Sequence, residues 1–210
     1  MARRSGGLPR LRADLSKLGG ALRAPLRRLS GGDDPYWDAF INRPPVDVRN
    51  TVAHVVRVAP EGNVFPTLTE LHSPEVTASH VKELTYYLKA QLVGIVDLSK
   101  QDPKLAHGYP YAIVTAVKAE YDPYTSPGIG GQAAVQAGQY PTFIVASWIR
   151  EMGFRASIKV ETTRDDRERL AVAAKLGKFD AFGRFTTPKY GTKIYVADII
   201  YTDLPMAADG

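Results

Sequence analysis

Leucines recur at helical spacing through the first thirty residues of the chain. They fall at positions 8, 11, 15, 18, 22, 26 and 29, and steps of three and four place them on one face of a helix. Basic residues fill many of the other positions. Residues 1–30 hold eight Lys or Arg and a single acid, Asp14. The pattern is typical of a basic amphipathic segment.

This segment predicts an N-terminal extension over residues 1–32. A basic helix with a leucine stripe can lie on an anionic membrane or dock in the groove of a partner protein, here through residues 8–29. Gly19, Gly20 and Pro25 oppose one continuous helix. A disordered, solubilising tail therefore stays open as an alternative.

The remaining pattern alternates between strand-like and helix-like stretches. Ser73 followed by Pro74 and Glu75 predicts a helix start, and Gly153 predicts a helix end. We expect strands over 51–58, 92–96, 109–117, 155–161 and 193–201, and helices over 73–88, 132–152 and 167–176. The order predicts one α+β domain over residues 33–210, with helices packed on a mixed sheet.

Composition removes several function classes. The chain contains no cysteine, which excludes disulfides, thiolate zinc sites and a cysteine-held iron–sulfur cluster in this chain. The four histidines lack metal-ligand spacing, so we expect no metal site. No long apolar run predicts a membrane-spanning helix. The net charge is +5, and residues 1–30 alone carry +7, so the other 180 residues sum to −2. We therefore expect no nucleic-acid-binding surface.

A glycine-rich loop precedes the longest predicted helix. Its candidate ligand-binding residues are Ser126, Gly128, Gly130 and Gly131. Glycines allow close approach of a ligand, and free amides at a helix start favour a phosphate, as in a flavin or a corrinoid nucleotide tail. An ordinary Gly-Pro loop is the alternative, because the spacing of a true phosphate loop is absent.

Three stretches in fixed order resemble the corrinoid-binding core of reductive dehalogenases and epoxyqueuosine reductases. The first is ELTYYLKAQLVGIVD at 83–97. The second joins YPYAIVTAV at 109–117 to ASWIREMG at 146–153. The third joins AAKLG at 173–177, TPKYG at 187–191 and TDLP at 202–205. The resemblance covers about residues 80–205 and is most specific in the third stretch.

The resemblance implies a nitroreductase-like α+β fold and a cobalamin in a cleft. It places six residues against the corrin face: Phe182, Gly183, Arg184, Phe185, Thr186 and Thr187. In the family, TDLP precedes eight cysteines that hold two iron–sulfur clusters, and these are missing here. The family's basic catalytic residue aligns with Ala181. Tyr86, Tyr140 and Arg184 are the remaining candidates for catalysis.

Three functions follow as alternatives. In the first, the chain is a corrinoid-binding redox protein or a cofactor-bearing subunit that receives electrons from an external donor. If the domain is active, it is then similar to an oxidoreductase. Alternatively, it is a flavin-dependent enzyme of the nitroreductase type, with FMN as the cofactor. The third alternative is a non-catalytic accessory subunit of a larger complex. We expect a cytoplasmic protein, membrane-associated if the extension binds lipid, with an electron donor or a scaffold protein as partner.

Overall fold

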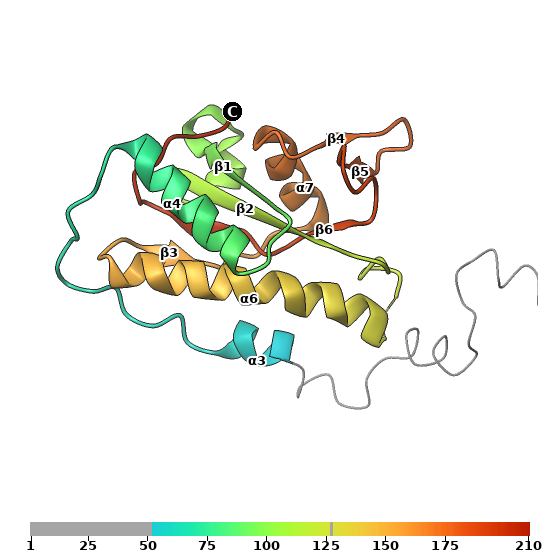
Figure 1. Cartoon of the computed structure of the whole chain (residues 1–210), viewed down its shortest axis with the longest axis horizontal. Coiled ribbons are helices and arrows are strands. Elements are labelled where there is room, and N and C mark those ends of the chain that lie inside the picture. The colour runs from blue at the N-terminus through green and yellow to red at the C-terminus, as the bar shows by residue number, and fades with distance from the viewer. Residues whose placement is uncertain (1–51, 127) are drawn as a thin grey trace, which may run out of the picture. The chain divides into compact units, whose positions relative to one another are not determined.

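The computed structural model describes residues 52–126 and 128–210 (Figure 1). The predicted extension over residues 1–32 and its boundary lie outside these residues. The helices are α3 (Val52–Val58), α4 (Pro74–Tyr87), the 3-10 helix η2 (Leu98–Lys100), α5 (Pro103–Ala106), α6 (Ile129–Glu151) and α7 (Arg164–Ala173). The strands are β1 (Leu92–Asp97), β2 (Tyr111–Lys118), β3 (Ala156–Ser157), β4 (Lys178–Phe179), β5 (Phe185–Thr186), β6 (Ile194–Val196) and β7 (Ile200–Thr202).

Strand β2 is the centre of the main sheet. It pairs with β1 along one edge and with both β6 and β7 along the other, and β3 pairs with β7. The α+β class is confirmed, but the prediction of a mixed sheet is wrong for the described residues, because all these pairings are antiparallel. The connection from β1 to β2 holds only η2 and α5, and it simply reverses the chain. A parallel pair needs a longer crossover.

The last predicted strand, over 193–201, is broken in two. Strands β6 and β7 both pair with β2, and residues 197–199 separate them. The Ala197 amide still donates to the Thr115 carbonyl at 2.9 Å. The next residue, Asp198, therefore sits in an interruption of the strand, where its side chain is free to turn towards α7.

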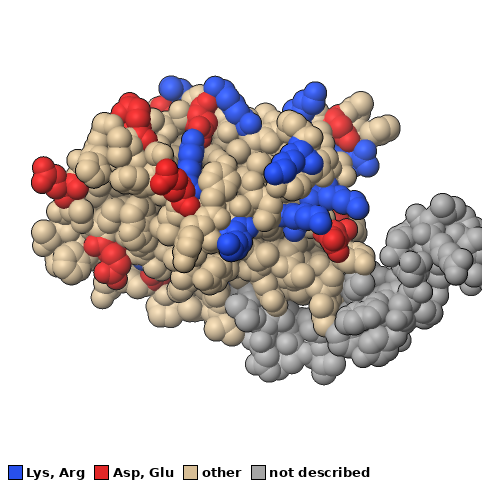
Figure 2. Space-filling view, in the orientation of Figure 1, with Lys and Arg blue, Asp and Glu red and all other residues tan. Residues whose placement is uncertain are grey.

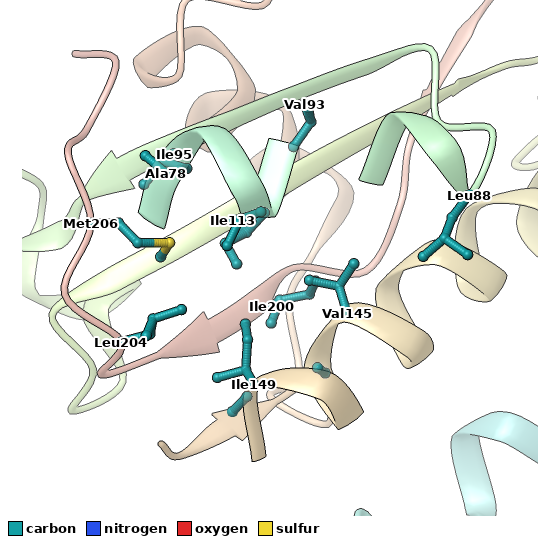
Figure 3. Packing of buried hydrophobic residues seen from close by; sticks show 13 residues of the cluster. Ala78, Leu88, Val93, Ile95, Ile113, Val145, Ile149, Ile200, Leu204 and Met206 are labelled. Carbon is teal, nitrogen blue, oxygen red and sulfur yellow. The ribbon is translucent and has the colours of Figure 1, made fainter. Parts of the chain in front are cut away.

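Helices cover both faces of the sheet, and alternate strand residues point to each face. Helices α4 and α6 cover one face, where a cluster forms around Val81, Ile95, Ile113, Ile149 and Ile200 (Figure 3). Helix α7 covers the other face, where Leu170 packs with Val96, Val114 and Tyr201. Both faces of β1 and β2 are thus buried, which explains their almost continuous apolar sequence.

The helix starts follow their local capping chemistry. The Ser73 side chain accepts a hydrogen bond from the Val76 amide, which confirms the predicted start of α4. Helix α7 begins at Arg164 rather than at the predicted residue 167, because Thr163 and Asp166 form a reciprocal capping box. Helix α6 begins three residues earlier than predicted and ends before Gly153, whose φ of 90° suits only glycine well.

Two strand predictions are wrong in whole or in part. Of the strand predicted over 51–58, residues 52–58 form helix α3, which packs on α6. Its β-branched residues favour a strand only weakly, and tertiary contacts override that preference. The strand predicted over 155–161 is reduced to β3. The Glu61 carboxylate accepts from the Ile158 amide at 3.1 Å and takes the place of a neighbouring strand.

Within the described part of the chain, no helix combines the length and apolar character that a membrane span requires.

The close approach of α6 to the strand break gives a testable prediction. A Cβ at Gly138 would lie 2.7 Å from Ala197 Cβ. We expect Gly138→Ala to lower the free energy of unfolding by about 1–2 kcal/mol, because overpacking outweighs the helix propensity gained. In an Ala197→Gly background the same change should be neutral or stabilising. Urea denaturation of the four proteins measures this coupling, and an equal cost in both backgrounds would contradict the packing described.

Candidate functional site

A buried ion pair joins helix α7 to the break in the last strand. Arg167 Nη1 lies 2.9 Å from Asp198 Oδ1, and the two side chains are only 9% and 16% exposed. Arg167 occupies the first turn of α7, one helical turn before Leu170 and Ala171, on the face that packs against the sheet. Asp198 reaches it because the strand is interrupted there.

Further side chains converge on this pair. Arg167 Nη1 donates to the Tyr195 hydroxyl at 3.2 Å, and Nη2 donates to the Tyr124 hydroxyl at 2.7 Å. Gln139 Nε2 donates to the second carboxylate oxygen of Asp198 at 3.1 Å. The exposed Arg57 approaches Asp198 at 3.4 Å. We call Arg167, Asp198, Tyr195, Tyr124 and Gln139 the arginine–tyrosine network.

The network is not fully hydrogen-bonded. Arg167 Nε and Gln139 Oε1 are buried, and neither has a hydrogen-bond partner among the described residues. Unsatisfied buried polar atoms cost stability and are uncommon in native proteins. The hydroxyls of Thr77, Thr115 and Tyr201, outside the network, are buried and unpaired as well in the described part of the chain. The network is a candidate for function because it combines its unpaired atoms with two buried charges.

Burial strengthens the preference of both network tyrosines for the protonated form, because it raises the pKa of each. Burial raises the pKa of Tyr124 to about 12, although the nearby Arg167 charge opposes this. Burial likewise raises the pKa of Tyr195, and Arg167 again acts against the shift. Each hydroxyl accepts a hydrogen bond from the arginine, so each can direct its own proton elsewhere. Tyr124 is 45% exposed, so its hydroxyl proton can be donated to a ligand.

The network lies between two cavities. The larger, of about 770 Å³, is bordered by Arg57, Arg167, Asp198 and residues 158–163. The smaller, of about 330 Å³, is bordered by the network residues Tyr124 and Tyr195. Its other bordering residues are Ala119, Glu120, Asp122, Pro123, Arg164, Glu168, Arg184, Phe185, Thr192, Lys193, Ile194 and Val196. We call the smaller one the tyrosine cavity. Arg167 therefore contacts one cavity directly and the other through two tyrosines.

A second arginine shapes the rim of the tyrosine cavity. The Arg164 guanidinium stacks 4.5 Å from the Tyr124 ring centroid, and its Nε lies 2.7 Å from Glu168. Such cation–π stacking restrains the ring and keeps positive charge beside it. Two arginines of α7 thus hold Tyr124: Arg164 contacts its ring, and Arg167 donates to its hydroxyl.

The structure brings some predicted residues to the tyrosine cavity. Arg184 and Phe185 border it, and Arg184 also pairs with Asp180 at 2.9 Å. Phe182 lies away from it, 83% exposed, and Gly183 forms the neighbouring turn with a φ of 74°. Thr186 lies in β5, and Thr187 is buried and hydrogen-bonded to Gly191.

The predicted glycine-rich loop does not border either cavity. A Cβ at Gly131 would lie 1.9 Å from the Ser126 carbonyl oxygen. Gly128 is the buried N-cap of α6 and offers no side-chain cap, and Gly130 lies in the first turn. Close packing of the loop on its own helix accounts for Gly131. A ligand-binding role for the loop stays a prediction.

The candidate catalytic tyrosines lie outside the network, although Tyr140 directly follows the network member Gln139 on α6. Tyr86 on α4 and Tyr140 on α6 are 47% and 58% exposed, and neither borders the two cavities. Their proposed roles stay predictions. Tyr124 and Tyr195, which do border the tyrosine cavity, were not predicted as catalytic.

The sequence does carry signals for the network. Arg167 falls at helical spacing with Leu170, Ala171 and Ala174, so it is a charge on an apolar face. Asp198 is an acid inside the apolar run IYVADIIY. Charges at such positions are almost never buried without a partner. The sequence therefore indicates that each of these two charges needs a buried partner, and the tertiary fold shows that they pair with each other.

Comparisons with known proteins place the fold. No protein-family model matches the sequence, and no curated protein matches it. Among solved structures, a variant of the catabolic reductive dehalogenase NpRdhA matches with a TM-score of 0.61 and 25% identity, covering 75% of this chain and 24% of that one. The unaltered NpRdhA matches with a TM-score of 0.60, 25% identity and the same coverage.

A further match is a reductive dehalogenase whose structure suggests a mechanism for B12-dependent dehalogenation. This reductive dehalogenase has a TM-score of 0.58 and 22% identity, covering 74% of this chain and 25% of that chain. The resemblance to reductive dehalogenases is confirmed. The chain spans about a quarter of the length of these proteins.

Removal of the buried arginine should be costly. We expect Arg167→Met to lower the free energy of unfolding by about 3–5 kcal/mol, because Asp198 stays buried without its main partner. Arg169→Met is the matched control on the same helix. Arg169 pairs with Asp165 at the surface, with both side chains about 60% exposed, so a change of about 0.5 kcal/mol or less is expected. Urea denaturation distinguishes the two, and equal losses would refute a structural ion pair.

The tyrosine pKa shifts predict an alkaline loss of stability. Folding favours the protonated form of Tyr124, whose pKa rises from 10.0 to about 12. Its contribution is therefore fully present below pH 10 and disappears as the pH rises to about 12. Stability should fall less steeply between pH 10 and 12 in Tyr124→Phe. Melting temperatures measured across this range test the sign, and a stability that rises between pH 10 and 12 would contradict it.

Proposed function

We propose that the chain is a corrinoid-binding redox domain that receives electrons from another protein. The fold match to reductive dehalogenases, one of them linked to B12-dependent dehalogenation, carries the proposal. The tyrosine cavity supports it, because Arg184 and Phe185, two residues that the resemblance assigns to the corrin face, border it together with Tyr124.

The size of the cavity limits what this chain does alone. Cavities of about 300–1,000 Å³ hold drug-sized ligands, and a corrinoid with its nucleotide tail is larger than these. The tyrosine cavity of about 330 Å³ therefore does not enclose the macrocycle. We infer that the residues at this cavity contact one edge of the group and that a second wall comes from another chain.

The residues present suit the polar periphery of a corrinoid. Its amide side chains and phosphate need hydrogen-bond donors, and the Tyr124 hydroxyl, Arg184 and Lys193 are donors at the cavity. The bound group would supply the redox chemistry. This chain's own contribution would be to orient the group and to hold a proton on the Tyr124 hydroxyl beside it.

The external electron donor follows from composition. These 210 residues contain no cysteine, so a cysteine-held iron–sulfur cluster would have to lie outside them. We therefore propose a separate electron-donor protein, or a soluble reductant, as the source of electrons.

A direct binding experiment tests the proposal. The purified full chain is titrated with hydroxocobalamin, and uptake is followed by the visible spectrum and by equilibrium dialysis. We expect saturable binding that Arg184→Gln weakens about tenfold, because a charge-assisted hydrogen bond is lost. Lys100→Gln, an exposed change on η2, should bind like the unaltered chain.

The size mismatch also favours one alternative, a non-catalytic accessory domain. That function predicts no saturable uptake of hydroxocobalamin and no effect of Arg184→Gln. A yellow protein that releases flavin on denaturation would instead support an FMN enzyme. Either result would contradict the corrinoid proposal.

A further inference from the structure

The small β4–β5 hairpin presents a stiff aromatic tip. Phe182 is 83% exposed, more than any other large hydrophobic residue of the described chain. Asp180 Oδ1 accepts from the amides of both Phe182 and Arg184 at 2.9 Å, and Gly183 adopts a φ of 74°. These bonds fix the turn, so the ring is held in water by the fold itself.

Lysines lie in the segments that flank this tip in the sequence. Residues 175–193 contain five basic residues and one acid: Lys175, Lys178, Arg184, Lys189, Lys193 and Asp180. Asp180 is paired with Arg184. In the part of the chain that the structure describes, the four lysines form no ion pair. Figure 2 shows Lys and Arg side chains gathered over the end of the molecule that carries β4 and β5.

The charge of the domain is segregated. Residues 52–210 contain equal numbers of basic and acidic residues, so the part outside 175–193 holds four more acids than bases. The positive charge of residues 175–193 is therefore a local feature rather than a reflection of the average. Such a surface attracts an anionic counterpart and orients the domain towards it.

We propose that the β4–β5 hairpin docks on an anionic lipid surface, with Phe182 entering the interfacial region. An aromatic ring flanked by cations is suited to the boundary between headgroups and acyl chains, and each nearby lysine adds electrostatic attraction to anionic lipid. Four of the five cations are lysines, a residue depleted in protein–protein interfaces. This composition favours a lipid surface over an acidic protein partner. The inference does not rest on the proposed function.

The absence of cysteine allows a local test in the full chain. Ala181→Cys, beside Phe182, is labelled with a polarity-sensitive fluorophore, and Tyr87→Cys serves as the control. Tyr87 is 76% exposed at the end of α4. Vesicles of phosphatidylserine and phosphatidylcholine should shift the emission of the first label to the blue and leave the second unchanged. Vesicles of phosphatidylcholine alone should shift neither.

Unlabelled variants supply the second readout. We expect Phe182→Ala to weaken the association of the hairpin with anionic vesicles about tenfold, because the variant lacks the aromatic side chain that enters the lipid. The double variant Lys178→Gln and Lys189→Gln should weaken vesicle association more than the control double variant Lys100→Gln and Lys104→Gln. Each is measured through the Ala181→Cys label, which reports only on its own position. If anionic vesicles leave the Ala181→Cys label unshifted, the proposal is overturned, and an acidic protein partner would predict that result. An equal response of both labels also overturns it.

Discussion

The ion pair between Arg167 and Asp198 organises the described part of the chain around its candidate site. It ties α7 to the interruption between β6 and β7, and through Gln139 it reaches α6. Burying two charges is costly unless geometry and further hydrogen bonds compensate. Here the compensating partners are Tyr124 and Tyr195, so the same interaction that stabilises the fold also positions the hydroxyls at the tyrosine cavity.

The strand break is the structural origin of this arrangement. An uninterrupted strand from Ile194 to Thr202 would keep its side chains alternating between the two faces. The interruption lets Asp198 leave that register and meet α7, while Ala197 keeps a hydrogen bond to the central strand and packs against Gly138. The site therefore depends on the close contact of α6 with the broken strand as well as on charge.

Much of the fold could be predicted because periodicity and capping act locally. The pattern of Leu92–Asp97 and the Ser73 cap needed no knowledge of distant residues. The helix over Val52–Val58 could not be predicted, because packing on α6 decides it. The network was missed for the same reason: its members come from four segments that only the tertiary fold assembles. The resemblance assigns Arg184 and Phe185 to the corrin face and both border the tyrosine cavity, but their contact with a cofactor stays a prediction.

The central claim is that the tyrosine cavity receives one edge of a corrinoid. A crystal structure of the full chain grown with cobalamin tests it most directly. We expect electron density for the corrinoid beside Tyr124 and Arg184, with the Arg167–Asp198 pair intact. Density for the group at another surface, or a tyrosine cavity filled by the chain itself, would contradict it.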